Sequence, residues 1–179
     1  CLGLISGFYG KWTDSLIMRI ADIQLSFPPI FLAIALMAVI PPSLVSLVLV
    51  LGTVSWVQFG RVARGSTLSV KEKEFVEAAR SLGTTNFKII LRHILPNILS
   101  PLMVIATVSM SSMILAEAGL SFLGLGVQPP TPAWGSMLSD GRTYFNVAWW
   151  YATFPGFAIF ITVLGFNMLG DGLRRKWAS

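Results

Sequence analysis

Four apolar blocks dominate this chain, and each is close to the length that a membrane-spanning helix needs. They cover residues 20–40, 43–60, 98–124 and 149–169. A helix that crosses the hydrocarbon core of a bilayer takes about 20 predominantly apolar residues. Residues 1–9 have the composition of the end of a further apolar segment, so we expect an N-terminally truncated fragment. The pattern predicts an all-α polytopic membrane protein, a bundle of about five transmembrane segments of which the first is partial.

The composition supports a membrane protein and argues against a soluble domain. Only 12% of the 179 residues are charged, and 54% are hydrophobic. A soluble domain typically has about 25% charged residues. Cys1 is the single cysteine, so an intramolecular disulfide is excluded, and no cluster of His, Cys and carboxylates has the spacing of a metal site. The net charge of +5 could indicate nucleic acid, but the basic residues flank apolar blocks, which is typical of membrane topology.

The basic residues also predict an orientation. Twelve of the 13 Lys and Arg residues fall in three segments, 10–19, 61–97 and the C-terminal tail, which lie on one side if the spans alternate. The 124–148 loop holds only Arg142. Because cytoplasmic loops carry the excess of Lys and Arg, we expect the 61–97 loop and the C-terminus in the cytoplasm.

The most charged loop has the pattern of two short amphipathic helices. The first has an apolar face at spacing i, i+3, i+4, i+7, formed by Phe75, Ala78, Ala79 and Leu82. The second repeats that spacing with Phe87, Ile90, Leu91 and Ile94. Gly83 is expected to end the first helix with a positive φ, and Thr84 or Thr85 to cap the second, which should end at Pro96. These apolar faces either lie on the protein's own helices or the lipid interface, which the pattern alone favours, or dock a cytosolic partner.

Several motifs then carry a resemblance to a known family. The loop has "EAA" at 77–79, Gly83, and "HILP" at 93–96. Further matches are "MRIADIQLSFP" (18–28), "GLSFLGLGVQPPTPAWGSML" (119–138) and "FNMLGDGLR" (166–174). Together they resemble the permease subunits of ATP-binding-cassette importers for dipeptides, oligopeptides and nickel, of the second-permease type.

The resemblance implies a function and a set of partners. The chain would form one permease domain, 1–179, that moves peptides or similar small solutes, nickel among them, into the cytoplasm. A coupling loop at 70–97 would contact a separate ATPase through Glu77, Ala78, Ala79, Leu82 and Gly83. The implied partners are a second homologous permease, two cytosolic ATPase subunits, an extracytoplasmic solute-binding protein and the lipid bilayer of a bacterial or archaeal inner membrane, with no nucleic acid. The chain would be no enzyme and would hold no cofactor, since ATP and Mg²⁺ bind to the ATPase subunits.

Two other polar positions lie in or near the apolar blocks. Glu117 is the one carboxylate deep in a span, and such a group usually faces the protein interior or water. It would line the translocation path, or it would make a structural hydrogen bond to Ser109, Ser112 or the backbone. Asp22 is expected to pair with Arg19 at i, i+3.

Two alternative functions follow from the residues alone. A self-sufficient secondary transporter or channel would need paired ionisable groups in its spans, and Glu117 is a single one. A membrane-embedded enzyme would need a nucleophile and a base, and no such constellation is present in the sequence.

Overall fold

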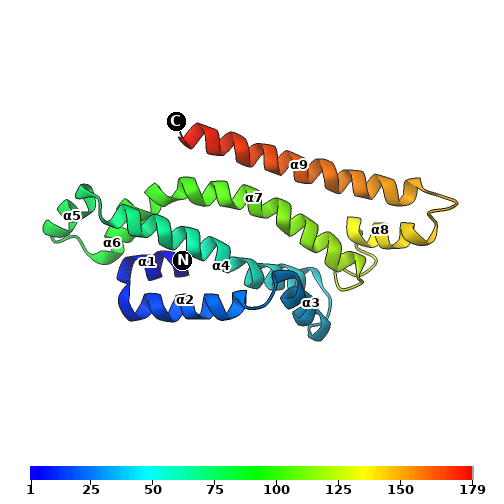
Figure 1. Ribbon diagram of the computed structural model, residues 1–179, viewed down its shortest axis with the longest axis horizontal. Helices are drawn as coiled ribbons and strands as arrows, with labels where there is room; N and C mark the ends of the chain where they lie inside the picture. The colour runs from blue at the N-terminus through cyan, green and yellow to red at the C-terminus, as the bar shows by residue number, and fades with distance from the viewer. Residues whose placement is uncertain (179) are drawn as a thin grey trace. The chain divides into compact units, whose positions relative to one another are not determined.

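The computed structural model describes residues 1–178, and side chains through Lys176, and every regular element in this range is helical (Figure 1). The helices are α1 (Leu2–Tyr9), α2 (Lys11–Leu25), α3 (Pro29–Val39), α4 (Leu44–Lys71), α5 (Glu74–Ser81), α6 (Asn86–Ile89), the π-helical turn η1 (Ile90–Ile94), α7 (Leu95–Phe122), α8 (Trp134–Thr143) and α9 (Trp150–Ala178). The chain divides into two compact units. Unit 1 holds Cys1–Ser26, Trp56–Ala106 and the chain end from Gly172, and unit 2 holds Phe27–Ser55 and Thr107–Asp171.

In unit 1, α1 packs closely on the C-terminal half of α4. A Cβ atom on Gly3 would lie 2.7 Å from the carbonyl carbon of Gly60, and one on Gly7 would lie 2.9 Å from the carbonyl oxygen of Arg64. Both distances are too short for a real side chain, so only glycine fits at these two positions. Gly3 and Gly7 have the four-residue spacing that lets helix backbones approach closely in membranes.

Unit 2 is built around a core from α3, α4 and α7. The buried side chains of this core are Ala33, Met37, Leu47, Val50 and Leu120. α8 rests on the C-terminal end of α7, where a Cβ on Gly135 would lie 2.8 Å from the Cβ of Ser121. The segment after α7 therefore folds back on the helix end rather than leaving it.

The predicted end of a helix at Pro96 is wrong. The chain is continuously helical from Asn86 to Phe122. Proline has no backbone N–H and its ring collides with the carbonyl of residue i−4 in a regular α-helix. The turn before it widens to a π-helix, in which the Leu95 N–H donates to the carbonyl of Ile90, so the proline is accommodated within the helix.

The predicted helical membrane fold is confirmed, and the candidate spans among the described residues are fewer than the five segments that the pattern indicated. Three helical segments are long and apolar enough to cross a membrane: Leu44–Lys71, Asn86–Phe122 and Trp150–Lys176. A fourth is possible in length and composition if α2 and α3, which are separated by a sharp break, count together. Pro28 and Pro29 stand at that break and prevent the predicted 20–40 helix from continuing. α1 has eight residues, less than the length of a span, and corresponds to the segment predicted to be partial.

Candidate functional site

The candidate coupling helix α5 has well-defined ends. Glu74 and Glu77 lie in its first turn and Arg80 in its last, which suits the helix dipole. Gly83 follows with φ 76°, so the predicted glycine stop is confirmed. The Gly83 N–H donates to the carbonyl of Arg80 at 3.0 Å and the Thr84 N–H to that of Ala79 at 3.1 Å. This pair of bonds is a Schellman motif, which fixes the direction in which the chain leaves α5.

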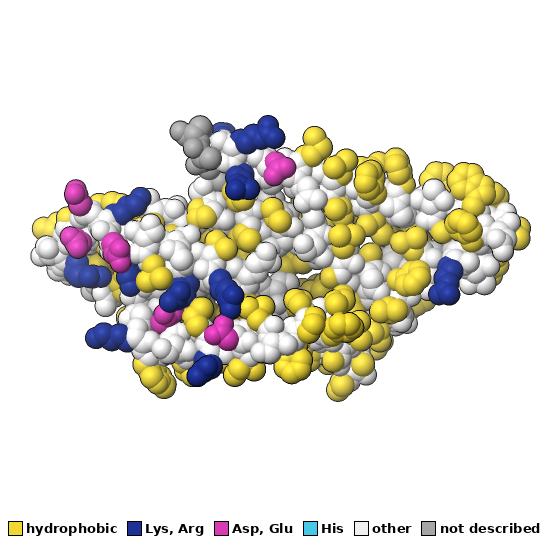
Figure 2. All heavy atoms as spheres, viewed as in Figure 1, with side chains coloured by type: hydrophobic (Ala, Val, Ile, Leu, Met, Phe, Trp, Pro, Cys, Tyr) yellow, Lys and Arg dark blue, Asp and Glu magenta, His cyan; other side chains and the backbone are white. Residues whose placement is uncertain are grey.

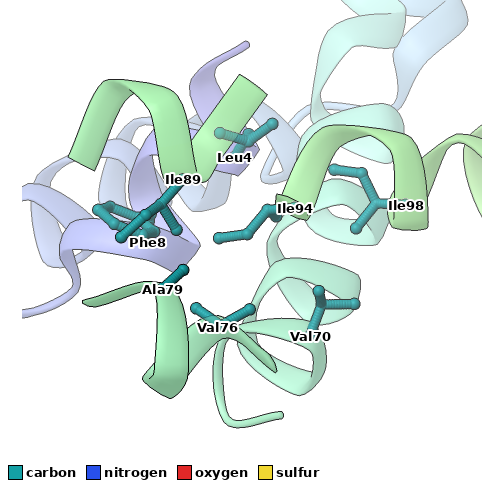
Figure 3. Close-up of a cluster of buried hydrophobic side chains, with 8 residues drawn as sticks. All are labelled: Leu4, Phe8, Val70, Val76, Ala79, Ile89, Ile94 and Ile98. Atoms are coloured by element: carbon teal, nitrogen blue, oxygen red, sulfur yellow. The ribbon is translucent and has the colours of Figure 1, made fainter. Parts of the chain in front are cut away.

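One face of α5 is anchored in the hydrophobic core of unit 1. Val76 is fully buried and Ala79 nearly so. They pack in a cluster whose other buried members are Leu4, Phe8, Val70, Ile89, Ile94 and Ile98, from α1, α4, α6, η1 and α7 (Figure 3). The candidate site is therefore held firmly against the ends of the long helices α4 and α7.

The neighbouring face of α5 is apolar as well, and it is exposed. Phe75, Ala78 and Leu82 lie at spacing i, i+3, i+7, and Leu82 is 85% exposed. Phe87 at the start of α6 is 70% exposed. We call these four residues, Phe75, Ala78, Leu82 and Phe87, the outer face. Phe75 is partly covered, at 40% exposed, whereas most of the Leu82 and Phe87 side chains is uncovered within the described residues.

The predicted single apolar face of α5 is therefore corrected to two. Ala79 belongs to the buried face, together with Val76, which is not part of the predicted face. The signal was present in the sequence, because positions 76 and 79 have i, i+3 spacing. The second predicted face divides in the same way: Ile94 is buried, whereas Phe87 and Leu91 are exposed.

The second predicted helix begins at its predicted cap. Thr85 occupies the N-cap position of α6 with an extended backbone, but its side chain makes no capping hydrogen bond. His93 lies half-buried in η1, and its ring is 6.3 Å from that of Phe75. This places the lone histidine in a packing contact.

A set of polar contacts joins α1 and α2 to α4, the helix that precedes α5. Arg64 donates to both carboxylate oxygens of Asp14, from Nε at 2.5 Å and Nη2 at 2.6 Å, and Ser6 also donates to Asp14. Lys71 Nζ donates to the carbonyl of Gly7 at 2.9 Å. Because Lys71 is the last residue of α4, this bond holds the helix end next to α5 in place.

The prediction that Asp22 pairs with Arg19 is wrong. Asp22 instead accepts a hydrogen bond from Arg61 Nη2 of α4 at 2.7 Å. The pairing across two helices depends on the packing of α2 against α4, which spacing within one helix does not reveal.

Glu117 lies in unit 2, whereas the α5 residues lie in unit 1. Its carboxylate is half-buried and accepts a hydrogen bond from Ser121 Oγ at 2.6 Å. The partner is neither of the two predicted serines, Ser109 and Ser112. Ser121 lies one helical turn after Glu117, at the i+4 spacing of helix neighbours.

In residues 1–178 no group of three or more His, Cys, Asp and Glu side chains could hold a metal ion.

The long apolar helices and the loop between α4 and α7 define a class of protein. It is a helical membrane protein in which a compact, partly apolar loop connects two candidate spans. Comparison with known families places the chain within that class. The chain belongs to the family described as "Binding-protein-dependent transport system inner membrane component", whose model matches residues 1–177. The predicted resemblance to importer permeases is confirmed, and the family is one of transport components rather than enzymes.

Curated relatives cover almost the whole chain. The dipeptide transport system permease protein DppC of Alkalihalophilus pseudofirmus is 51% identical over 97% of this chain and 57% of its own length. The glutathione transport system permease protein GsiD of Escherichia coli is 48% identical over 93% of this chain and 55% of its own length. GsiD of Pectobacterium atrosepticum is 45% identical over 97% of this chain and 58% of its own length. The chain thus spans a little over half the length of these relatives.

Proposed function

We propose that this chain is the membrane permease subunit of an ATP-driven importer and that the outer face of its loop docks on a cytosolic ATPase. The observation that carries the proposal is the division of α5 into two apolar faces. Val76 and Ala79 anchor the helix internally, while Phe75, Ala78 and Leu82 remain exposed. An exposed apolar patch rimmed by polar residues is typical of a protein interaction site.

The anchoring supports a mechanical role for the loop. Val76 and Ala79 share one cluster with Val70 at the end of α4 and Ile98 at the start of α7. Close-packed interiors transmit displacements, so a movement of α5 would shift the ends of both long helices. The continuous helix from Asn86 to Phe122 extends that path from the loop into a candidate span.

Each candidate residue has a distinct part in this proposal. Ala78 and Leu82 would contact the ATPase directly, and Glu77, exposed in the first turn of α5, would set the orientation of docking through its charge. Ala79 would act on the buried side, as an anchor. Gly83 would fix the turn that leads to α6. ATP and Mg²⁺ would bind to the partner ATPase subunits.

The orientation and the further partners follow from the charge pattern and the family. The basic 61–97 loop and the C-terminus would face the cytoplasm. The membrane domain would pair with a second homologous permease, assemble with two ATPase subunits and receive its cargo from an extracytoplasmic solute-binding protein. The names of the relatives favour small peptides such as dipeptides or glutathione as cargo. Nickel is the alternative cargo that the family resemblance implies. Uptake of labelled dipeptide, glutathione and Ni²⁺ into liposomes that contain the complex would distinguish these cargoes.

The docking proposal is tested by placing a charge on the outer face. Leu82→Glu should reduce co-purification of the ATPase, because a carboxylate must lose its water on docking against an apolar groove. Val147→Glu is the matched control, since Val147 is 82% exposed and lies outside the loop. Equal amounts of both variants in the membrane would show that folding is intact. If Leu82→Glu retains the ATPase as fully as Val147→Glu, the outer face is not the docking surface.

A further inference from the structure

A charged pocket lies between α2 and the C-terminal half of α4, apart from the coupling loop. Its volume is about 610 Å³, within the range of small-molecule sites. The space-filling view shows basic and acidic side chains, dark blue and magenta, gathered over these helices (Figure 2). The pocket is lined by Asp14, Ser15, Met18, Arg19, Asp22, Arg61 and Arg64.

The pocket carries one more positive charge than negative charge. Asp14 is matched by Arg64 through two hydrogen bonds, and Asp22 is matched by Arg61. The third arginine, Arg19, is exposed and forms no ion pair within residues 1–178. The guanidinium of Arg19 is thus free to meet an anion that enters the pocket, beside an Arg61 side chain that is 51% exposed.

An apolar stripe runs along α2 next to this pocket. Trp12, Leu16, Ile20 and Ile23 follow the spacing i, i+4, i+8, i+11, and all four are exposed, Trp12 by 75%. Arg19 lies at the edge of the stripe, directly before Ile20. An apolar stripe bordered by an arginine lets acyl chains lie along the helix while the charged group stays at the level of the headgroups.

We propose that this pocket binds the phosphate headgroup of an anionic phospholipid whose acyl chains lie along the α2 stripe. Guanidinium groups complement phosphate oxygens in charge and in hydrogen-bond geometry. Basic pockets between helices at the membrane surface are suited to lipid headgroups. Free phosphate shares this chemistry, but it would leave the stripe uncovered, so the stripe favours a lipid. The site is independent of loop docking and would persist if that proposal failed.

Native mass spectrometry of the protein, purified in detergent with the subunits that accompany it, tests the site. The probes are phosphatidylglycerol and phosphatidylcholine with identical acyl chains, and inorganic phosphate. We expect phosphatidylglycerol to bind in preference to phosphatidylcholine. Arg19→Gln should lower phosphatidylglycerol occupancy about fivefold, the effect of removing one basic group near a membrane surface. Arg142→Gln, an exposed arginine of α8 outside the pocket, should leave it unchanged.

A second variant keeps the test decisive if Arg19→Gln should aggregate. Ser15→Glu adds a carboxylate to the exposed rim of the pocket and should also repel the lipid, with helicity checked by circular dichroism. Equal binding of the two lipids, or normal phosphatidylglycerol binding by both variants, would overturn the proposal. So would displacement of phosphatidylglycerol by inorganic phosphate, which would identify a free anion as the ligand. Loss of an accompanying subunit from Arg19→Gln with unchanged lipid binding would assign the surface to a protein partner instead.

Discussion

Arg64 holds Asp14 with two hydrogen bonds at once, 2.5 Å from Nε and 2.6 Å from Nη2, although the two residues are 50 positions apart in the chain. Two parallel bonds between a guanidinium and a carboxylate fix orientation as well as distance. The pair joins α2 to α4 at the level where Gly7 of α1 packs against the Arg64 backbone. It therefore holds α2 against α4, the helix whose C-terminal end packs beside α5.

Removal of this pair should destabilise the protein measurably. Asp14→Asn leaves the half-buried Arg64 with a neutral partner, and we expect the free energy of unfolding in detergent to fall by about 1–2 kcal/mol. Asp22→Asn is the control, because its pair with Arg61 is more than half exposed and should contribute about 0.5 kcal/mol or less. Thermal unfolding of the two variants compares them. An equal fall for both would mean that the two-bond geometry adds nothing.

Gly83 should resist substitution for a purely conformational reason. Its φ is +76° and a Cβ there would meet no atom within 4 Å, so Gly83→Ala introduces backbone strain of about 1–2 kcal/mol and no collision. We expect the variant to reach the membrane and to lose substrate-stimulated ATP hydrolysis in the assembled complex. Gly65→Ala is the matched control, because Gly65 has equally open space but lies within helix α4. Full hydrolysis by Gly83→Ala would show that the turn is not required for coupling.

Two variants of Glu117 distinguish a role in the translocation path from a structural role. Glu117→Gln keeps an acceptor for the hydroxyl of Ser121 and removes only the charge. If Glu117 lines the path, this variant should change the rate of uptake while the complex still assembles. Glu117→Leu also removes the acceptor and reports on packing. Normal uptake by Glu117→Gln together with a low yield of Glu117→Leu would make the residue structural.

The helical membrane fold and the glycine stop of α5 could be predicted because they depend on local properties. Apolar block length predicts spans, and the conformational freedom of Gly83 predicts a helix end. The continuation of the helix through Pro96 could not be predicted, because a π-helical turn accommodates the proline and this turn depends on the packing of neighbouring residues such as Ile94. The break before α3 was hidden by the uniform hydrophobicity of the 20–40 block, although Pro28 and Pro29 marked it.

The sequence predicts the helix α5 but not the orientation of its faces. The spacing of Ala78, Ala79 and Leu82 located an apolar helix, yet only the tertiary structure shows that Ala79 points into the protein with Val76. The ion pairs of Asp14 and Asp22 join residues at least 39 positions apart, so no local pattern could have identified their partners.

Cysteine labelling tests most directly whether the outer face meets a cytosolic partner. In a background with Cys1→Ser, Leu82→Cys should react with a membrane-impermeant maleimide only from the cytoplasmic side, and Pro132→Cys only from outside. Addition of the ATPase subunits to inside-out vesicles should protect Leu82→Cys, while Asn97→Cys, at an exposed position in the first turn of α7 outside the outer face, should stay reactive. Labelling of Leu82→Cys from outside, or equal labelling with and without the ATPase, would contradict the proposed docking of this loop.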